Sequence, residues 1–145
     1  MKKTIIAAMV SLGMGSLVLA QTIKKGNENQ SVPLVVEQVF QKQYPGVKHK
    51  WEKEGNKYEA EFKFQNHEMS SLYETNGALV ETEVEISVKE LPAEVTRYVA
   101  ENHLGKIKEA SKITKADGSV EYEAEVKGGD AIFDSKGSFL NLKKD

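Results

Sequence analysis

The chain has 145 residues, with 20 Lys and Arg against 22 Asp and Glu, three His and no Cys. This length fits one ordinary domain or two very small ones. The near-neutral charge excludes a nucleic-acid binder that relies on a basic surface. The lack of Cys excludes thiol catalysis, disulfide scaffolds and zinc knuckles.

Residues 1–20 predict a secretory signal peptide. Lys2 and Lys3 give it a positive start, an apolar stretch follows, and residues 18–20 have the small side chains of a cleavage site. A retained membrane anchor is the less favoured alternative, because about 20 mainly apolar residues are needed to span a bilayer. We therefore expect an exported protein, periplasmic or secreted, with no stable membrane insertion once the signal is removed.

Residues 21–31 predict a flexible leader, because they are polar apart from Ile23 and bury too little surface to become ordered. Without residues 1–20 the chain keeps 18 basic and 22 acidic side chains, a formal net charge of −4. The residues from 32 to 145 are left to form the folded domain.

Two segments begin in the same way, with an apolar residue followed by proline. Pro33 and Pro92 lie 59 positions apart, and each suits the first position of a helix. Apolar residues then recur at steps of three and four, which predicts one amphipathic helix in each segment. Gly46 and Gly105, also 59 positions apart, indicate where these helices end.

After each helix the sequence alternates with period two, which predicts strands. Residues 58–62 reappear in pattern at 122–126, and residues 73–77 reappear at 133–137. We therefore infer an internal repeat of one helix plus four strands, with repeat one at 32–90 and repeat two at 91–145. The strands are expected at residues 47–54, 57–65, 68–74, 79–87, 107–115, 120–127, 130–134 and 138–143.

The predicted fold class is α+β, with the two tandem repeats forming one antiparallel sheet. The connections have hairpin length, which makes neighbouring strands antiparallel. One side of each strand is apolar and the other charged, so we expect helices on one face and water on the other. Neither repeat buries its helix and sheet well alone, so we expect one continuous unit with a shared core.

Several motifs resemble those of the PepSY-like family of β-lactamase-inhibitor-like domains. They are the proline-started helix, Tyr44-Pro45-Gly46 with Trp51, the Tyr-Glu-Ala-Glu strands and the aromatic-acid-x-x-Gly turns. The resemblance spans about residues 32–142 and places a single PepSY-like domain at 32–145. It implies export, a sheet backed by helices like that of the β-lactamase inhibitory proteins, and a role in binding or restraining another protein, such as a peptidase.

The charged sheet face is the candidate binding surface, because it carries eight glutamates against three lysines. Like charges on neighbouring strands are destabilising, although Lys48 and Lys50 on the adjacent strand would offset some of them. We hypothesise an acidic platform for a basic partner, another envelope or secreted protein, with binding that weakens as salt rises. The alternative is a solvated face that keeps the protein soluble. The candidate binding residues are Glu59, Glu61, Glu81, Glu83, Glu123 and Glu125, and the face is completed by Glu85, Glu121, Lys57, Lys63 and Lys127.

No set of residues amounts to a catalytic or metal site, and we expect no enzyme activity and no cofactor. The glutamates alternate on an open face, where nothing desolvates one of them for general acid–base work. His49, His67 and His103 share no metal-binding motif. There is no Gly-x-Ser-x-Gly elbow and no phosphate-binding glycine loop. Nucleic acid is not an expected partner.

Trp51 has two interpretations. It alternates with Val47 and His49, which places it on the helix-covered face with Tyr58, Ala60 and Phe62 and favours a core position. Tryptophan is also enriched at binding hot spots, so a binding anchor is the alternative.

The sequence thus predicts an exported, non-enzymatic binding module, inhibitor-like in its specific form, that uses the open sheet face. The alternative function is a cell-envelope scaffold or stress-related protein that binds a small molecule or a polysaccharide. Exposure of Trp51, Phe64 or Tyr73 would favour that alternative.

Overall fold

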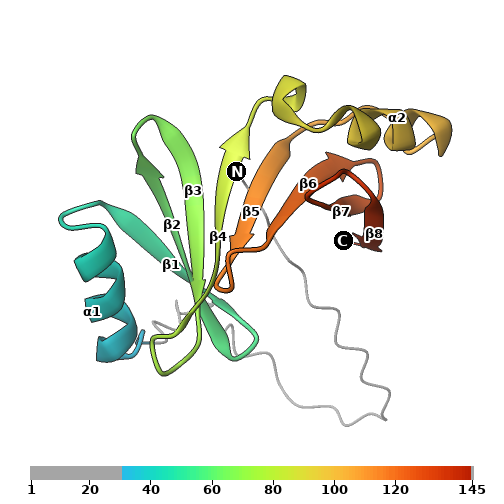
Figure 1. The fold of residues 1–145 in the computed structure, drawn as a ribbon. Coiled ribbons are helices and arrows are strands. Elements are labelled where there is room, and N and C mark those ends of the chain that lie inside the picture. Colours follow the sequence, from blue (N-terminus) through green and yellow to red (C-terminus); the bar gives the residue numbers. More distant parts are fainter. Residues whose placement is uncertain (1–30, 145) are drawn as a thin grey trace, which may run out of the picture. The chain divides into compact units, whose positions relative to one another are not determined.

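Eight strands form one sheet, in which each strand is hydrogen-bonded to its neighbours in the sequence (Figure 1). The computed structural model describes residues 31–144. The predicted signal peptide and residues 21–30 of the predicted leader lie outside these residues. Every strand pair is antiparallel. The elements are α1 (Leu34–Gln43), β1 (His49–Glu54), β2 (Lys57–Phe64), β3 (His67–Tyr73), β4 (Leu79–Ile86), the 3-10 helix η1 (Val88–Glu90), α2 (Ala93–Glu101), β5 (Ala110–Lys115), β6 (Val120–Val126), β7 (Gly129–Asp134) and β8 (Phe139–Lys143).

The α+β class with one antiparallel sheet and two helices is confirmed. Both α-helices begin directly after a proline, so Pro33 and Pro92 are the N-cap residues and not the first helical residues that the sequence predicts. The carbonyl of Pro33 accepts Val36 N–H at 2.9 Å, and that of Pro92 accepts Val95 N–H at 3.0 Å. Each helix buries two residues four positions apart, Val36 and Phe40 on α1 and Val95 and Val99 on α2.

Both helices pack on the same face of the sheet. Residues that stand opposite one another on neighbouring strands share a face of the sheet. From β2 to β6, one such row consists of Phe62, Met69, Val84, Lys112 and Tyr122. Because side chains alternate along a strand, Tyr58 shares the face of Phe62 and therefore that of Tyr122. The two matching Tyr-Glu-Ala-Glu strands thus present their tyrosines on one side, as a duplicated unit requires.

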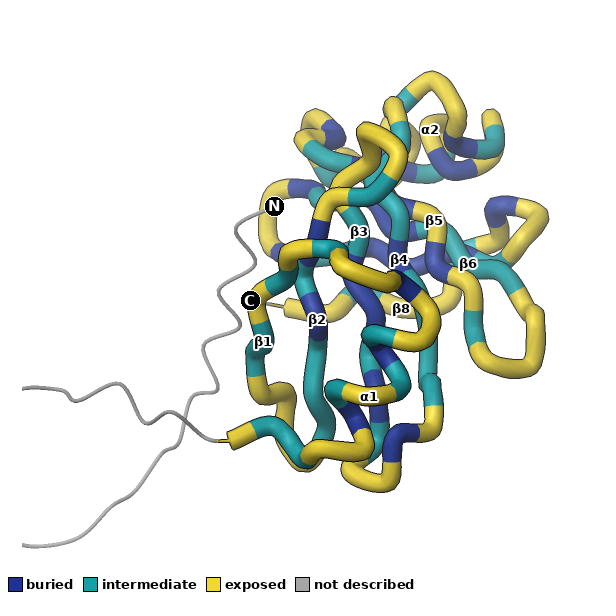
Figure 2. The backbone as a smooth tube through the Cα atoms, turned by 90° about the vertical axis from the view of Figure 1, so that its left-hand side faces the viewer, coloured by how far each residue is buried: buried dark blue, intermediate teal, exposed yellow. Residues whose placement is uncertain are grey.

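The buried apolar residues form two clusters, each of which includes residues of one helix. Figure 2 shows the buried positions along the backbone in dark blue. The α1 cluster includes Phe40 and Tyr73, and the α2 cluster includes Val99 and Phe133. Both clusters reach β4, but at opposite ends of the strand: Leu79 packs against the first and Ile86 against the second. The expectation of one shared core was therefore too simple. Eight strands about 4.8 Å apart are wider than a helix of about 10 Å can cover, so each helix covers its own end.

The repeats also share the turn after their third strand. Gly77 N–H donates to Glu74 O, and Gly137 N–H donates to Asp134 O, each at 2.9 Å. The strand register shifts just before both turns, between Leu72 and Tyr73 and between Ile132 and Phe133. Matching irregularities at matching positions support the internal repeat more strongly than matching strands do.

Small departures from the prediction occur where the sequence carries little periodic signal. The first strand of each repeat begins at His49 and Ala110 instead of 47 and 107. The helix η1 was not predicted, because a single turn is too short to show a period; Ser87 and Glu90 cap it reciprocally. Within residues 31–144, neither α-helix has the length and apolar character needed to cross a bilayer.

Candidate binding face

All the glutamates predicted to bind lie on the sheet face opposite α1 and α2, and we call this surface the acidic face. Their strands alternate, so these side chains point away from the residues that contact the helices. One row of register pairs crosses it from Glu61 through Ser70, Glu83 and Ile113 to Glu121. The acidic face comprises Glu59, Glu61, Glu81, Glu83, Glu85, Glu121, Glu123 and Glu125.

The acidic face is more buried than the sequence predicts. Glu83 and Glu123 are only 7% and 5% exposed, and the other glutamates are half-buried. Ile113 lies opposite Glu83, and Ile132 lies opposite Glu123, and both isoleucines are buried. The expectation that nothing desolvates these glutamates is therefore wrong, since apolar side chains reach the same face between them.

Glu59 shows the clearest consequence of this burial. Burial raises its pKa from 4.5 to about 7; a hydrogen bond with Ser70 opposes the rise, and the charges of Glu54, Glu83 and Glu61 add to it. Near neutral pH this carboxyl is therefore partly protonated, and the charge of the acidic face depends on pH. A raised pKa is one property of a general acid, but catalysis also needs partner groups and a place for a substrate.

Lys115 offsets part of the acidic charge. Its Nζ lies 2.6 Å from Glu81 Oε2 and 3.2 Å from Glu121 Oε2, so one ammonium joins β4 to β6 across β5. The prediction did not count this lysine, although its alternation with Ser111 and Ile113 places it on the same face.

Lys48 and Lys50, which the sequence analysis named as offsetting the acidic charge, neutralise less of it than Lys115 does. Lys48 is exposed and precedes β1. Lys50 pairs with Glu52 on its own strand and therefore mainly neutralises an acid that had not been counted. At the other side of the acidic face, Lys108 Nζ lies 2.9 Å from Glu125 Oε1.

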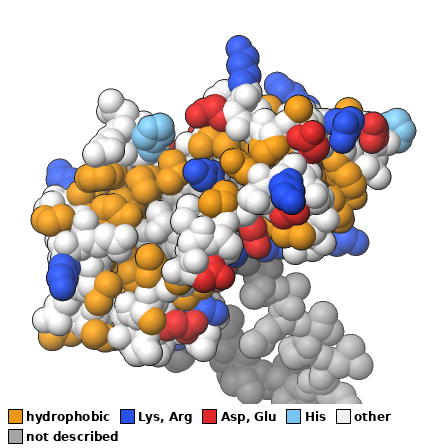
Figure 3. Space-filling model, in the orientation of Figure 1, with side chains coloured by type: hydrophobic (Ala, Val, Ile, Leu, Met, Phe, Trp, Pro, Cys, Tyr) orange, Lys and Arg blue, Asp and Glu red, His pale blue; other side chains and the backbone are white. Residues whose placement is uncertain are grey.

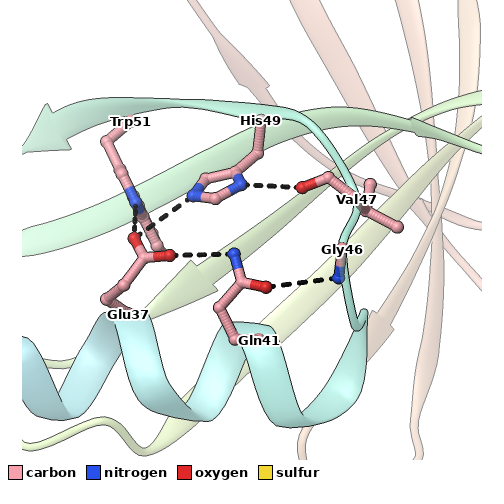
Figure 4. A network of polar contacts seen from close by, with 6 residues as sticks. All are labelled: Glu37, Gln41, Gly46, Val47, His49 and Trp51. Atoms are coloured by element: carbon pink, nitrogen blue, oxygen red, sulfur yellow. Dashed lines mark hydrogen bonds and ion pairs between the residues drawn. The ribbon is translucent and has the colours of Figure 1, made fainter.

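On the helix-covered face, a polar network joins α1 to the edge strand β1 (Figure 4). Glu37 Oε2 accepts Trp51 Nε1–H at 2.7 Å and lies 3.2 Å from His49 Nε2, and Glu37 Oε1 accepts Gln41 Nε2–H at 3.0 Å. Burial alone raises the pKa of Glu37, but hydrogen bonds from Gln41, Trp51 and His49 outweigh it and lower the pKa. Sequence analysis missed this network because His49 and Trp51 lie 12 and 14 positions from Glu37 and follow no motif.

Trp51 packs at the margin of the α1 cluster. Its ring centroid lies 5.6 Å from that of Phe40 and 6.0 Å from that of Tyr73, and its N–H is taken by Glu37. This packing supports the core interpretation of Trp51 over the anchor interpretation.

The aromatic platform that would favour a polysaccharide ligand is not formed by the residues named for it. Tyr73 is fully buried, and the half-buried Phe64 packs its ring 5.4 Å from that of Tyr44. Trp51 is half-buried as well and packs against Phe40 of α1, so none of the three is fully exposed.

Among residues 31–144, no group of three His, Asp or Glu side chains is arranged to hold a metal ion. His67 and His103 are exposed; His67 begins β3 and His103 lies in the turn after α2. The molecular face in Figure 3 shows acidic and basic side chains interspersed with hydrophobic ones instead of gathered by sign. A hollow of about 260 Å³ beside the end of β4 is lined by Glu68, Glu85 and Glu90 among others.

No protein-family model and no curated protein matches the chain. Solved structures with a similar fold were found. A protein from Bacteroides eggerthii, inferred to be periplasmic, has a TM-score of 0.68 at 18% identity, over 79% of this chain and 89% of that one. A DUF2874 family protein from Bacteroides uniformis has a TM-score of 0.66 at 17% identity, over 77% and 88%.

A BLIP-like protein from Bacteroides fragilis has a TM-score of 0.59 at 24% identity, over 76% of this chain and 84% of that one. At these identities the likeness shows the fold alone. The chain therefore has the BLIP-like α+β fold, with two helices on one face of an eight-stranded antiparallel sheet.

Proposed function

We propose that this protein is an exported, non-enzymatic binding module of the PepSY-like, β-lactamase-inhibitor-like type, which holds another protein on its acidic face. The observation that carries the proposal is the gathering of eight glutamates on the sheet face opposite the helices. The likeness to a BLIP-like protein and to a protein inferred to be periplasmic supports both the binding role and the export.

The partner is an envelope or secreted protein with a basic surface. Lys115 neutralises part of the acidic face, but eight glutamates still exceed the lysines that contact them. Half-buried acids such as Glu61 and Glu85 keep enough exposure to meet a partner. An excess of one sign speeds encounter with the opposite sign, and the effect weakens as salt screens it.

Capture of partners from a periplasmic extract at low and at high salt tests the proposal. The face variant carries Glu61→Gln and Glu85→Gln, and the matched control carries Glu94→Gln and Glu101→Gln on the exposed side of α2, with the same change of charge. We expect the wild type and the control to capture the same protein at low salt and release it at high salt, and the face variant to lose it. Equal capture by both variants would place binding elsewhere.

A further inference from the structure

His49 lies with both ring nitrogens facing hydrogen-bond acceptors (Figure 4). Nδ1 is 3.0 Å from Val47 O, and Nε2 is 3.2 Å from Glu37 Oε2. A carbonyl oxygen and an ionised carboxylate have no proton to donate, and a neutral imidazole carries only one N–H. Both contacts are therefore hydrogen bonds only when His49 carries both protons. In the neutral ring, one nitrogen lone pair faces an acceptor.

The surroundings of the ring leave Glu37 as its charged partner. The side chain of His49 is 13% exposed, and its ring centroid lies 4.2 Å from that of Phe40 on α1 and 5.4 Å from that of Trp51. The residue opposite it on β2 is the apolar Phe62. Its sequence neighbours on either side are lysines, which alternation directs to the other face of β1.

We propose that His49 and Glu37 form a proton-dependent latch that fastens α1 to the edge strand β1. When His49 is protonated, the ring bridges Val47 O and the Glu37 carboxylate, and α1 is held against the strand. When the proton leaves, the ring loses its charge attraction to Glu37, and one of its nitrogens faces an acceptor with no proton between them, so this end of α1 is held less tightly. The sheet stays folded, because Phe40 remains in the α1 cluster and Glu37 keeps its other donors. Because the latch depends on this proton, pH controls how firmly α1 is held.

The single tryptophan of the chain reports on this latch directly. A protonated imidazole quenches a nearby indole, so the emission of Trp51 should increase in one transition as the pH rises from 5 to 8. Amide exchange in α1, corrected for its intrinsic pH dependence, should become about tenfold faster over the same range, as expected for loss of a charged hydrogen bond. Exchange in β5 and β6 should not follow this change.

His49→Gln should abolish the emission transition, and His67→Gln, in the exposed β2–β3 hairpin, should keep it. Because His49→Gln also alters packing, nitrogen NMR of the wild-type ring gives a second measurement, in which both nitrogens of His49 should carry protons at pH 5.5. The proposal is overturned if His49 is neutral at pH 5.5, if the emission transition persists in His49→Gln, or if exchange in α1 does not depend on pH.

Discussion

Gly77 and Gly137 hold the same place in the two repeats, and each lies against the helix of its own repeat. Their φ angles are 86° and 85°. A Cβ added at Gly77 would stand 3.2 Å from methyl groups of Val35 and Val39, and one added at Gly137 would stand 2.8 Å from Glu94 Cβ. Each turn thus packs on its helix; a Cβ would clash at Gly137 and would be tight at Gly77.

Gly137→Ala should lower the free energy of unfolding by about 2–5 kcal/mol. A positive φ costs a residue with a Cβ about 1–2 kcal/mol, and overpacking against α2 adds about 1–3 kcal/mol. Gly118→Ala is the control, since Gly118 has a φ of 84° and nothing within 4 Å of an added Cβ. Urea denaturation should show a clearly smaller loss for Gly118→Ala, and equal losses would mean that the turn does not dock on α2.

Trp51→Ala should lower the free energy of unfolding by about 3 kcal/mol, because the ring packs against Phe40 and Tyr73. Trp51→Phe retains an aromatic ring but loses the hydrogen bond to Glu37, and should cost about 1 kcal/mol. Urea denaturation followed by circular dichroism measures both. If Trp51→Ala is as stable as the wild type but loses its partner, the binding-anchor interpretation is correct.

The backbone of the fold was readable from the sequence because its signals are local. Pro33 and Pro92 each stand directly before an apolar pattern of helical period. The alternation in residues 58–62 assigns side chains to faces without knowledge of the partner strand. A glycine such as Gly77 indicates a positive φ, because it has no Cβ that would clash in that conformation. These local preferences were sufficient to predict eight strands, two helices and their order.

The chemistry of the site depends on contacts between distant positions, and the sequence does not show them. The burial of Glu83 depends on Ile113 standing opposite it, which requires the register between β4 and β5. The link between Glu37 and His49 spans 12 positions, from a helix to a strand. Alternation identified the acidic face correctly, but which glutamates are desolvated there follows only from the folded sheet.

Lys115→Met should destabilise the fold by about 1–2 kcal/mol, because it leaves Glu81 and Glu121 without their shared cation while keeping the apolar stem. Lys63→Met is the control, since both Lys63 and its partner Glu68 are exposed and the substitution should cost less than about 1 kcal/mol. Adding Glu121→Gln to Lys115→Met should recover part of the loss. Urea denaturation at low salt tests this, and equal costs for the two lysines would contradict a bridging role.

The raised pKa of Glu59 makes stability depend on pH in a direction that can be checked. Because its pKa rises from 4.5 to about 7 on folding, the folded chain holds this proton more tightly than the unfolded chain does. The stabilisation of the fold by the protonated Glu59 carboxyl is therefore complete below about pH 4.5. It is lost as the pH rises through 7, which lowers the free energy of unfolding by about 1–3 kcal/mol. Glu59→Gln replaces the carboxyl with a neutral group of the same shape, so its advantage over the wild type should be larger at pH 8 than at pH 5. Urea denaturation at both pH values measures this. Glu94→Gln, at an exposed position of α2, is the control, and its stability should change with pH as that of the wild type does. If the stability of Glu59→Gln also changes with pH as that of the wild type does, Glu59 is ionised in the fold and the acidic face keeps a constant charge across neutral pH.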